Sequence, residues 1–485
     1  MIGRYLLKIN YEFQVEKSQL IAILRVLDAK ELKILKKWLH SPIHNQREDV
    51  VALFEYLTSG NHLAEAKFLY KERVFPKVFG RSAPYDDAKI RQTIHFLQKA
   101  VEKFLVFEEL TADEIRNKIA LAISFRQRNL DKVFQRTLSG LEESRETTGQ
   151  RTDSFFRNEY LIEQEKYNFM ADRQPAAKLN LQAVADALDK TFIIEKLKLS
   201  CRMIFHQALY KANYEISFLE DILEFIENKD LIKEPAIGVY YYILKAITEQ
   251  QDDRRYFEQL RSLVQSSIRV FPPSELREIY LMGINYCIKK INAADEAYKR
   301  ETFEWYKQGL ESKILLENNQ VTQKTYFNAV AAALLVKEFN WADRFIAGYK
   351  KWLPADQREN LSHFCRSKLL FEKKDYKSAM RLLAQVEYDD ILLNLNAKSM
   401  LVKMLYEQEE LDSLDSLLES VRTFIQRKKV IGYHKNIYSN LVKYTRKLVR
   451  VNPYSAEQKE KLRQEILAAN PLAERQWLLE QLGQL

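Results

Sequence analysis

Apolar residues in the C-terminal third of the chain recur at a fixed distance of 35 residues. Three short turns are predicted at Phe339-Asn340-Trp341, Lys374-Asp375-Tyr376 and Glu410-Leu411, and their bulky residues share this spacing. A period of 35 residues accommodates two helices of about 14 residues with their turns. Neither helix buries its apolar stripe alone, so successive units must stack. The other repeating positions are Leu334/Leu369/Met404, Leu335/Leu370/Leu405, Val336/Phe371/Tyr406 and Ala347/Leu382/Leu417.

The same rhythm of helices and turns continues upstream with looser spacing. Prolines mark several boundaries, since proline lacks the N–H group that a helix interior requires. The Pro272-Pro273 pair, followed by Ser274 as an N-cap, is one such boundary. The pattern predicts helix pairs at 115–128 and 130–147, 153–170 and 175–189, 191–211 and 214–228, 236–250 and 253–270, and 274–291 and 294–316.

Residues 1–110 show a different pattern, with longer loops between the helices. Asp28-Ala29-Lys30-Glu31 is a capping-box pattern, which predicts a helix through Leu39. A second helix is predicted at about 46–59, and a long helix from Asp86 keeps its apolar residues on one face. We therefore expect a small helical domain ahead of the repeats.

The 35-residue units resemble tetratricopeptide repeats, whose usual unit is about 34 residues. Asp375-Tyr376 followed by Ala379 is similar to the start of the second helix in that family, although Ala332, Ser367 and Val402 occupy the place of its usual glycine. The overall pattern also resembles a family of long, uncharacterised bacterial helical-repeat proteins.

The resemblance implies an all-α fold, a right-handed superhelix of antiparallel helix pairs known as an α-solenoid. The predicted parts of the chain are an N-terminal helical domain at 1–110, an irregular helix-pair array at 111–320, tetratricopeptide-like repeats at 321–430 and basic capping helices at 431–485.

Composition supports a helical, soluble protein. The 485 residues include only 11 Gly and 10 Pro, well below ordinary usage of roughly 7% and 5%. Apolar residues at 46% and charged residues at 29% exclude wholesale disorder. The three cysteines are far apart, which excludes a disulfide framework and favours a reducing cytoplasm. The longest apolar run, Ala329–Val336, has eight residues, whereas a membrane-spanning helix needs about 20.

Glycine and histidine spacing excludes several catalytic motifs. The closest glycines, Gly140 and Gly149, are nine residues apart, which excludes the dinucleotide fingerprint, the P-loop and the nucleophile elbow. None of the seven histidines precedes Glu, so the H-E-x-x-H zinc motif is absent. His40 and His44 flank Pro42, which favours a helix-ending turn over a metal site. We expect no catalysis, cofactor or metal.

Basic residues concentrate near the C-terminus. Arg422–Arg450 holds nine bases and no acid, directly after six acids in Met404–Ser420. On a helix at 435–451 the apolar residues form a stripe on one side and the basic residues a face on the other. This basic face would either be the solvated surface of a terminal capping helix or bind an anionic partner such as a nucleic acid. The apolar stripe fits a protein core and argues against membrane insertion. The basic face consists of Lys435, Lys443, Arg446, Lys447 and Arg450.

The favoured function is a non-catalytic scaffold that binds a protein partner. Stacked helix pairs curve and offer a concave groove for a peptide or helix. In the family that the repeats resemble, the first helix of each unit lines this groove, here 322–338, 356–373 and 391–408. The 35-residue spacing aligns Asn328, His363 and Lys398 as candidate partner-binding residues. The alternative is a nucleic-acid-associated regulator that uses the basic C-terminal helix.

Overall fold

The computed structural model shows an all-helical chain. It describes residues 18–147, 149, 151, 153–173, 178–210, 212–249, 253–386, 391–427 and 433–485. An isolated β-bridge joins Glu317 and Gln320, and none of the described residues belongs to a β-strand. Of the predicted N-terminal domain, residues 1–17 lie outside the described part. The all-α prediction is confirmed.

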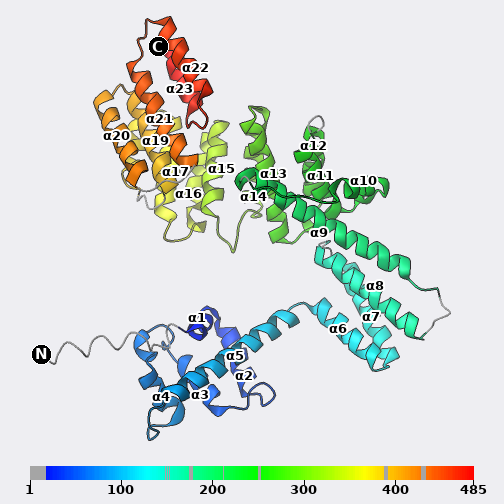
Figure 1. The fold of residues 1–485 in the computed structure, drawn as a ribbon. Helices are drawn as coiled ribbons and strands as arrows, with labels where there is room; N and C mark the ends of the chain where they lie inside the picture. Colours follow the sequence, from blue (N-terminus) through cyan, green and yellow to red (C-terminus); the bar gives the residue numbers. More distant parts are fainter. Residues whose placement is uncertain are drawn as a thin grey trace, which may run out of the picture. The chain divides into compact units, whose positions relative to one another are not determined.

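The chain divides into two compact units, Met1–Thr148 with Ser154–Leu188 and Gly149–Asp153 with Asp189–Leu485. Figure 1 shows the helices of each unit in sequence order. The first unit contains α1 (Gln19–Val26), α2 (Ala29–His40), α3 (Glu48–Leu57), α4 (Lys71–Phe79), α5 (Asp87–Thr111), α6 (Glu114–Gln127), α7 (Asp131–Thr147) and most of α8 (Asp153–Arg173).

Local capping chemistry defines the helices of the first unit. The Asp28 carboxylate accepts a hydrogen bond from Glu31 N, and the Glu31 carboxylate accepts one from Asp28 N at 2.7 Å, so the capping box is formed. The Asp86 side chain caps α5 by accepting from Lys89 N. Helix α5 then packs its apolar face, including Leu97 and Phe104, into a core shared with α1 to α4. The helices predicted from these caps are confirmed.

One predicted division of the chain is wrong. The ranges 175–189 and 191–211 were expected to be separate helices, whereas the structure has one helix, α9 (Leu181–Tyr210). No glycine or proline occurs between its ends, so nothing interrupts the helical hydrogen bonds. Residues 175–177 and 211 of the two predicted ranges lie outside the described part.

The second unit is a succession of helices in which consecutive helices pack together, as the repeat pattern predicts. Pro235 and Pro273 occupy first-turn positions, where the missing N–H costs nothing. After α9, the helices are α10 (Leu219–Asn228), α11 (Pro235–Thr248), α12 (Asp253–Ser266), α13 (Pro273–Asn292), α14 (Ala297–Glu311), α15 (Gln323–Leu335), α16 (Phe339–Tyr349), α17 (Arg358–Glu372), α18 (Tyr376–Leu383), α19 (Ile391–Glu407), α20 (Leu411–Arg427), α21 (Tyr433–Arg450), α22 (Ala456–Ala468) and α23 (Arg475–Gln484).

A common turn geometry joins the paired helices. Lys337, Lys374 and Glu409 follow α15, α17 and α19 in the left-handed conformation, with φ of 59°, 62° and 58°. In each turn the next residue donates its N–H to the carbonyl oxygen five residues back, at 2.9 Å. This bond satisfies a free carbonyl at the helix end. The first reversal ends at Glu338, so the predicted turn at 339–341 is instead the first turn of α16.

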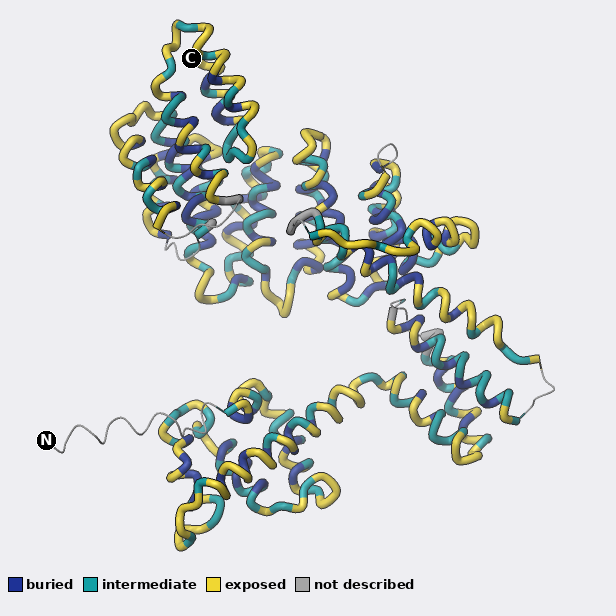
Figure 2. The backbone as a smooth tube through the Cα atoms, in the orientation of Figure 1, coloured by how far each residue is buried: buried dark blue, intermediate teal, exposed yellow. Residues whose placement is uncertain are grey.

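The odd-numbered helices α15, α17 and α19 form a continuous row, which we call the odd-helix row. Each helix of the row contacts the next one as well as its own even-numbered partner. Phe327 of α15 stacks on Phe364 of α17, with ring centroids 5.7 Å apart. Figure 2 shows buried residues along the faces where neighbouring helices meet. The row thus supplies both the core and one face of the repeats.

Candidate partner-binding surfaces

The three aligned residues lie on successive helices of the odd-helix row, and all three are half-buried. Asn328 of α15 lies beside the hydroxyl of Tyr306 on α14, and it partly offsets the burial that raises the pKa of this hydroxyl to about 12. His363 of α17 faces Glu359 of its own helix, with Nε2 to Oε2 at 3.8 Å. The polar atoms of these two residues therefore turn to different neighbours.

Lys398 of α19 has a third environment. Its Nζ donates a hydrogen bond to Ser420 Oγ on α20 at 3.1 Å, and burial lowers its pKa. It lines a cavity of about 770 Å³ together with Asp415 and Glu419. In the described part of the chain, no hydrogen bond or ion pair joins Asn328, His363 and Lys398 to one another. The row aligns the three positions but does not cluster their polar groups.

Two lysines, Lys368 and Lys403, share the same 35-residue spacing and lie on the odd-helix row. Lys368 Nζ sits 4.7 Å from the ring centroid of Phe327, and Lys403 Nζ sits 4.8 Å from that of Phe371. Each ammonium group thus covers an aromatic ring of the preceding helix of the row, a favourable electrostatic contact. Burial lowers the pKa of Lys368. Sequence reasoning missed these lysines, although their spacing of 35 residues was available.

Glu407, the last residue of α19, joins three elements near the C-terminal end. Its carboxylate pairs with Lys374 Nζ at 2.7 Å and accepts hydrogen bonds from Tyr376 and from Trp477 Nε1, the latter at 2.9 Å. Burial opposes ionisation, but these donors outweigh it and lower the pKa of Glu407. Because its side chain is only 14% exposed, Glu407 acts as a structural junction.

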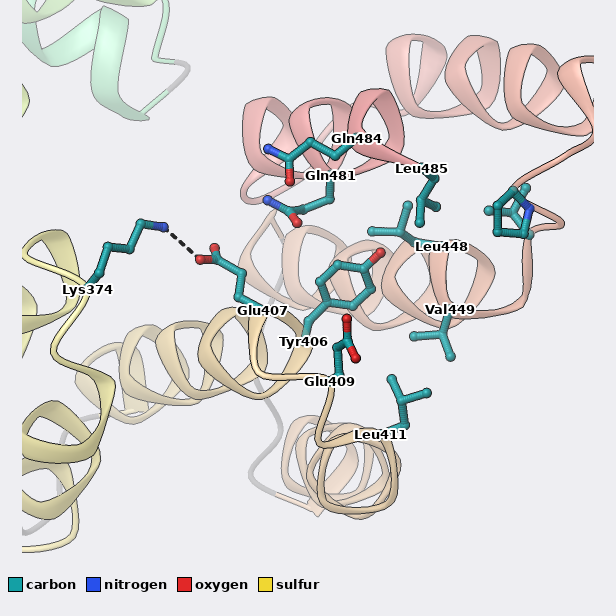
Figure 3. A pocket seen from close by; sticks show the side chains of 12 residues that line it. Lys374, Tyr406, Glu407, Glu409, Leu411, Leu448, Val449, Gln481, Gln484 and Leu485 are labelled. Carbon is teal, nitrogen blue, oxygen red and sulfur yellow. Dashed lines mark hydrogen bonds and ion pairs between the residues drawn. The ribbon is translucent and has the colours of Figure 1, made fainter.

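A cavity of about 520 Å³ opens beside this junction, between the ends of α19, α21 and α23. Figure 3 shows Tyr406, Gln481 and Gln484 around it, together with the Lys374–Glu407 ion pair. Its lining combines amide and carboxylate groups with aliphatic side chains such as Leu448. The only cation that lines it is already held by Glu407.

The basic helix α21 is partly neutralised within the protein. Arg446 pairs with Glu419 at 3.0 Å and lies 3.7 Å from Asp415, both on α20, and Lys447 pairs with Glu465 of α22. Hydrogen bonds from Arg446 and Lys447 lower the pKa of Glu419 and Glu465. The acidic and basic runs of the sequence therefore meet each other.

The other three predicted basic residues of α21 remain available. Lys435, Lys443 and Arg450 are exposed, and none of them forms an ion pair with another described residue. The structure thus divides the predicted basic face into two internally paired residues and three exposed ones.

Candidate catalytic groups are dispersed. His40 ends α2 and faces Glu55 at 3.3 Å, whereas the His44 ring stacks on Trp38, so the two imidazoles have different partners. Within the described residues no three His, Cys, Asp or Glu side chains gather as a metal site. The three cysteines are free and buried. None of the described helices has the length and apolar character needed to cross a bilayer.

Comparisons with known proteins identify no relative. No protein-family model, no curated protein and no solved structure matches the chain. The findings on this chain are therefore its all-helical architecture, its sequentially paired helices and the surfaces described above.

Proposed function

We propose that this protein is a non-catalytic scaffold that binds a peptide or helix of a partner protein. In this proposal the second unit winds as a right-handed, tetratricopeptide-like superhelix, and the odd-helix row forms its concave face. The observation that carries the proposal is the contact of α15 with α17 and of α17 with α19, since the described residues of α16, α18 and α20 make no contacts of comparable extent with one another. A stack whose helices approach more closely on one side curves toward that side.

The side chains on the row support recognition of a polypeptide. Asn328 supplies an amide, His363 an imidazole and Lys398 an ammonium group, at intervals of 35 residues along the stack. The His363 side chain is 30% exposed, so a ligand can reach part of its ring, whereas Nδ1 is buried and has no hydrogen-bond partner among the described residues. Half-buried Phe327 adds apolar surface beside Lys368. Such a mixture suits extended or helical segments.

Site-specific photo-crosslinking in the native host tests this proposal. A photoreactive amino acid placed at 328, 363 or 398 should give discrete higher-mass adducts with a partner protein. Exposed positions on the even-numbered helices, Lys377 of α18 and Asp412 of α20, are matched controls that should give none. Adducts from the control positions alone, or none from the row, would contradict the proposed binding face.

A second candidate function is nucleic-acid binding through α21, favoured by the exposure of Lys435, Lys443 and Arg450. Three phosphate contacts predict a slope of about −2 for log affinity against log salt with single-stranded RNA. Charge reversal of these three residues should abolish that binding. Binding to random RNA or DNA that is unchanged in this triple variant would remove the candidate.

A further inference from the structure

An apolar groove of about 390 Å³ lies between α9 and α10, far along the chain from the odd-helix row. Its floor is formed by buried Ile193 and Ile222. Three phenylalanines surround it while remaining exposed, Phe192 at 52%, Phe218 at 68% and Phe225 at 38%. Single exposed apolar residues are common on proteins, but three aromatic side chains around one groove mark a binding surface.

The backbone at Phe218 gives independent support. This residue is the N-cap of α10 and adopts a left-handed conformation with φ of 62° and ψ of 12°. A bulky aromatic residue is strongly disfavoured in that region, where glycine or asparagine is usual. Its side chain makes no cap hydrogen bond. Phe218 is therefore poorly suited to its local conformation, and the use of its ring at the groove would account for its presence.

The charges around the groove define the partner. The two charged residues that line it, Asp189 and Asp221, are both acidic and exposed. Neither forms an ion pair with another described residue. Helix α10 itself carries four acids and no base in the sequence LEDILEFIEN. This field attracts cationic segments and repels nucleic acids and anionic lipid surfaces.

Beyond the groove, α9 exposes a further apolar residue on the same face as Phe192. Leu199 is half exposed and follows Phe192 by seven residues, so it lies on the same face of the helix two turns further on. Apolar contacts spaced in this way match the anchor residues of an extended or helical segment better than a single small molecule.

We propose that the groove formed by Phe192, Phe218 and Phe225 binds a cationic peptide segment of a partner protein, which inserts an apolar side chain between the rings and places Lys or Arg beside Asp189 and Asp221. This site is separate from the odd-helix row, so it does not depend on the function proposed above. Aromatic residues contribute most of the binding energy in such interfaces, and the carboxylates select the sign of the partner's charge.

A display library of random 12-residue peptides, selected on the full-length protein, tests the proposal. The selected sequences should combine a large apolar residue with flanking Lys or Arg. A labelled peptide from this pool should bind at least tenfold more weakly to the double variants Phe192→Ser/Phe218→Ser and Asp189→Lys/Asp221→Lys, as measured by fluorescence anisotropy. Tyr454→Ser, which removes an aromatic side chain that is 96% exposed elsewhere, should leave binding unchanged.

A further variant separates binding from folding. Phe218→Gly places glycine at a left-handed position and should preserve the fold while weakening the peptide at least tenfold. An acidic or neutral selected pool, an absence of binders, or equal binding to wild type and both double variants would overturn the proposal. Self-association that is lost in Phe192→Ser/Phe218→Ser would assign the groove to a second copy of the chain, and would overturn it as well.

Discussion

Replacement of a single residue in one inter-helix turn tests the turn geometry of the helical array. Ala294 follows α13 with φ of 67°, and Asp295 N bonds to the Lys290 carbonyl oxygen at 3.1 Å, which is the same pattern as in the 35-residue repeats. Ala294 is exposed, so its methyl group adds little packing. Ala294→Gly should therefore stabilise the second unit by relieving a strained backbone conformation.

The size of the effect follows from two opposing contributions. An L-residue in the left-handed region costs about 1–2 kcal/mol relative to the right-handed one. Glycine costs about 0.5–1 kcal/mol more than alanine in conformational entropy on folding. The difference leaves a net stabilisation of about 0.5–1 kcal/mol. For a unit of this size that corresponds to a rise in Tm of about 1–3 °C.

Tryptophan fluorescence during thermal unfolding measures the effect, because Trp305, Trp341, Trp352 and Trp477 lie in the second unit and only Trp38 lies in the first. Ala347→Gly is the matched control, since Ala347 is exposed within α16, where the same change should cost up to about 1 kcal/mol. The two variants should shift Tm in opposite directions. An equal loss of Tm in both would refute the argument from backbone strain.

Three further outcomes are expected. Glu407→Gln should destabilise the second unit by about 1–2 kcal/mol at pH 7. The folded state lowers the pKa of Glu407, so the stabilisation from its carboxylate is present above the unfolded pKa and is lost as pH falls through the folded pKa. Urea titrations of the variant and wild type should therefore give the same stability in acid. Gly283→Ala should destabilise the second unit by about 1–3 kcal/mol, since the added Cβ would lie 2.7 Å from the Trp305 ring. Gly348→Ala adds its Cβ in open space and should stabilise α16 by up to about 1 kcal/mol. Equal Tm values for the two variants would contradict both expectations. The three buried cysteines, with thiol pKa values raised by burial, should react with a thiol reagent only in urea, and fast reaction of the native protein would contradict their burial.

Helices were predictable where local chemistry defines them. The capping box at Asp28 and the N-cap at Asp86 depend on residues within three positions, and the structure contains both. The false boundary near Lys190 arose where charged residues interrupted the apolar pattern within α9. Charged side chains such as those of Asp189 and Lys190 do not end a helix, because they leave its backbone hydrogen bonds intact. Local polarity was therefore a weaker signal than the absence of glycine and proline.

The candidate surfaces were less predictable, because a repeat period fixes which residues are equivalent but not which way they face. Asn328 and Lys398 share a phase, yet one contacts α14 and the other α20. Lys368 and Lys403 share another phase, and both cover a ring of the preceding helix. The rotation of each helix about its axis follows from packing against neighbours 35 or more residues away, and no local pattern specifies it.

The charge runs near the C-terminus show the same effect at longer range. In the sequence, the basic residues of 422–450 suggest one basic surface, because the acidic residues that could pair with them lie in the preceding segment. Antiparallel packing of α20 against α21 brings Glu419 to Arg446, and α22 brings Glu465 to Lys447. Such partly exposed pairs contribute little stability, but they neutralise charge that an anionic partner would otherwise meet. Charge reversal at Arg446 would place like charges beside Asp415 and Glu419 and should therefore lower the Tm of the second unit, whereas reversal at the exposed Lys435 or Arg450 should leave Tm unchanged.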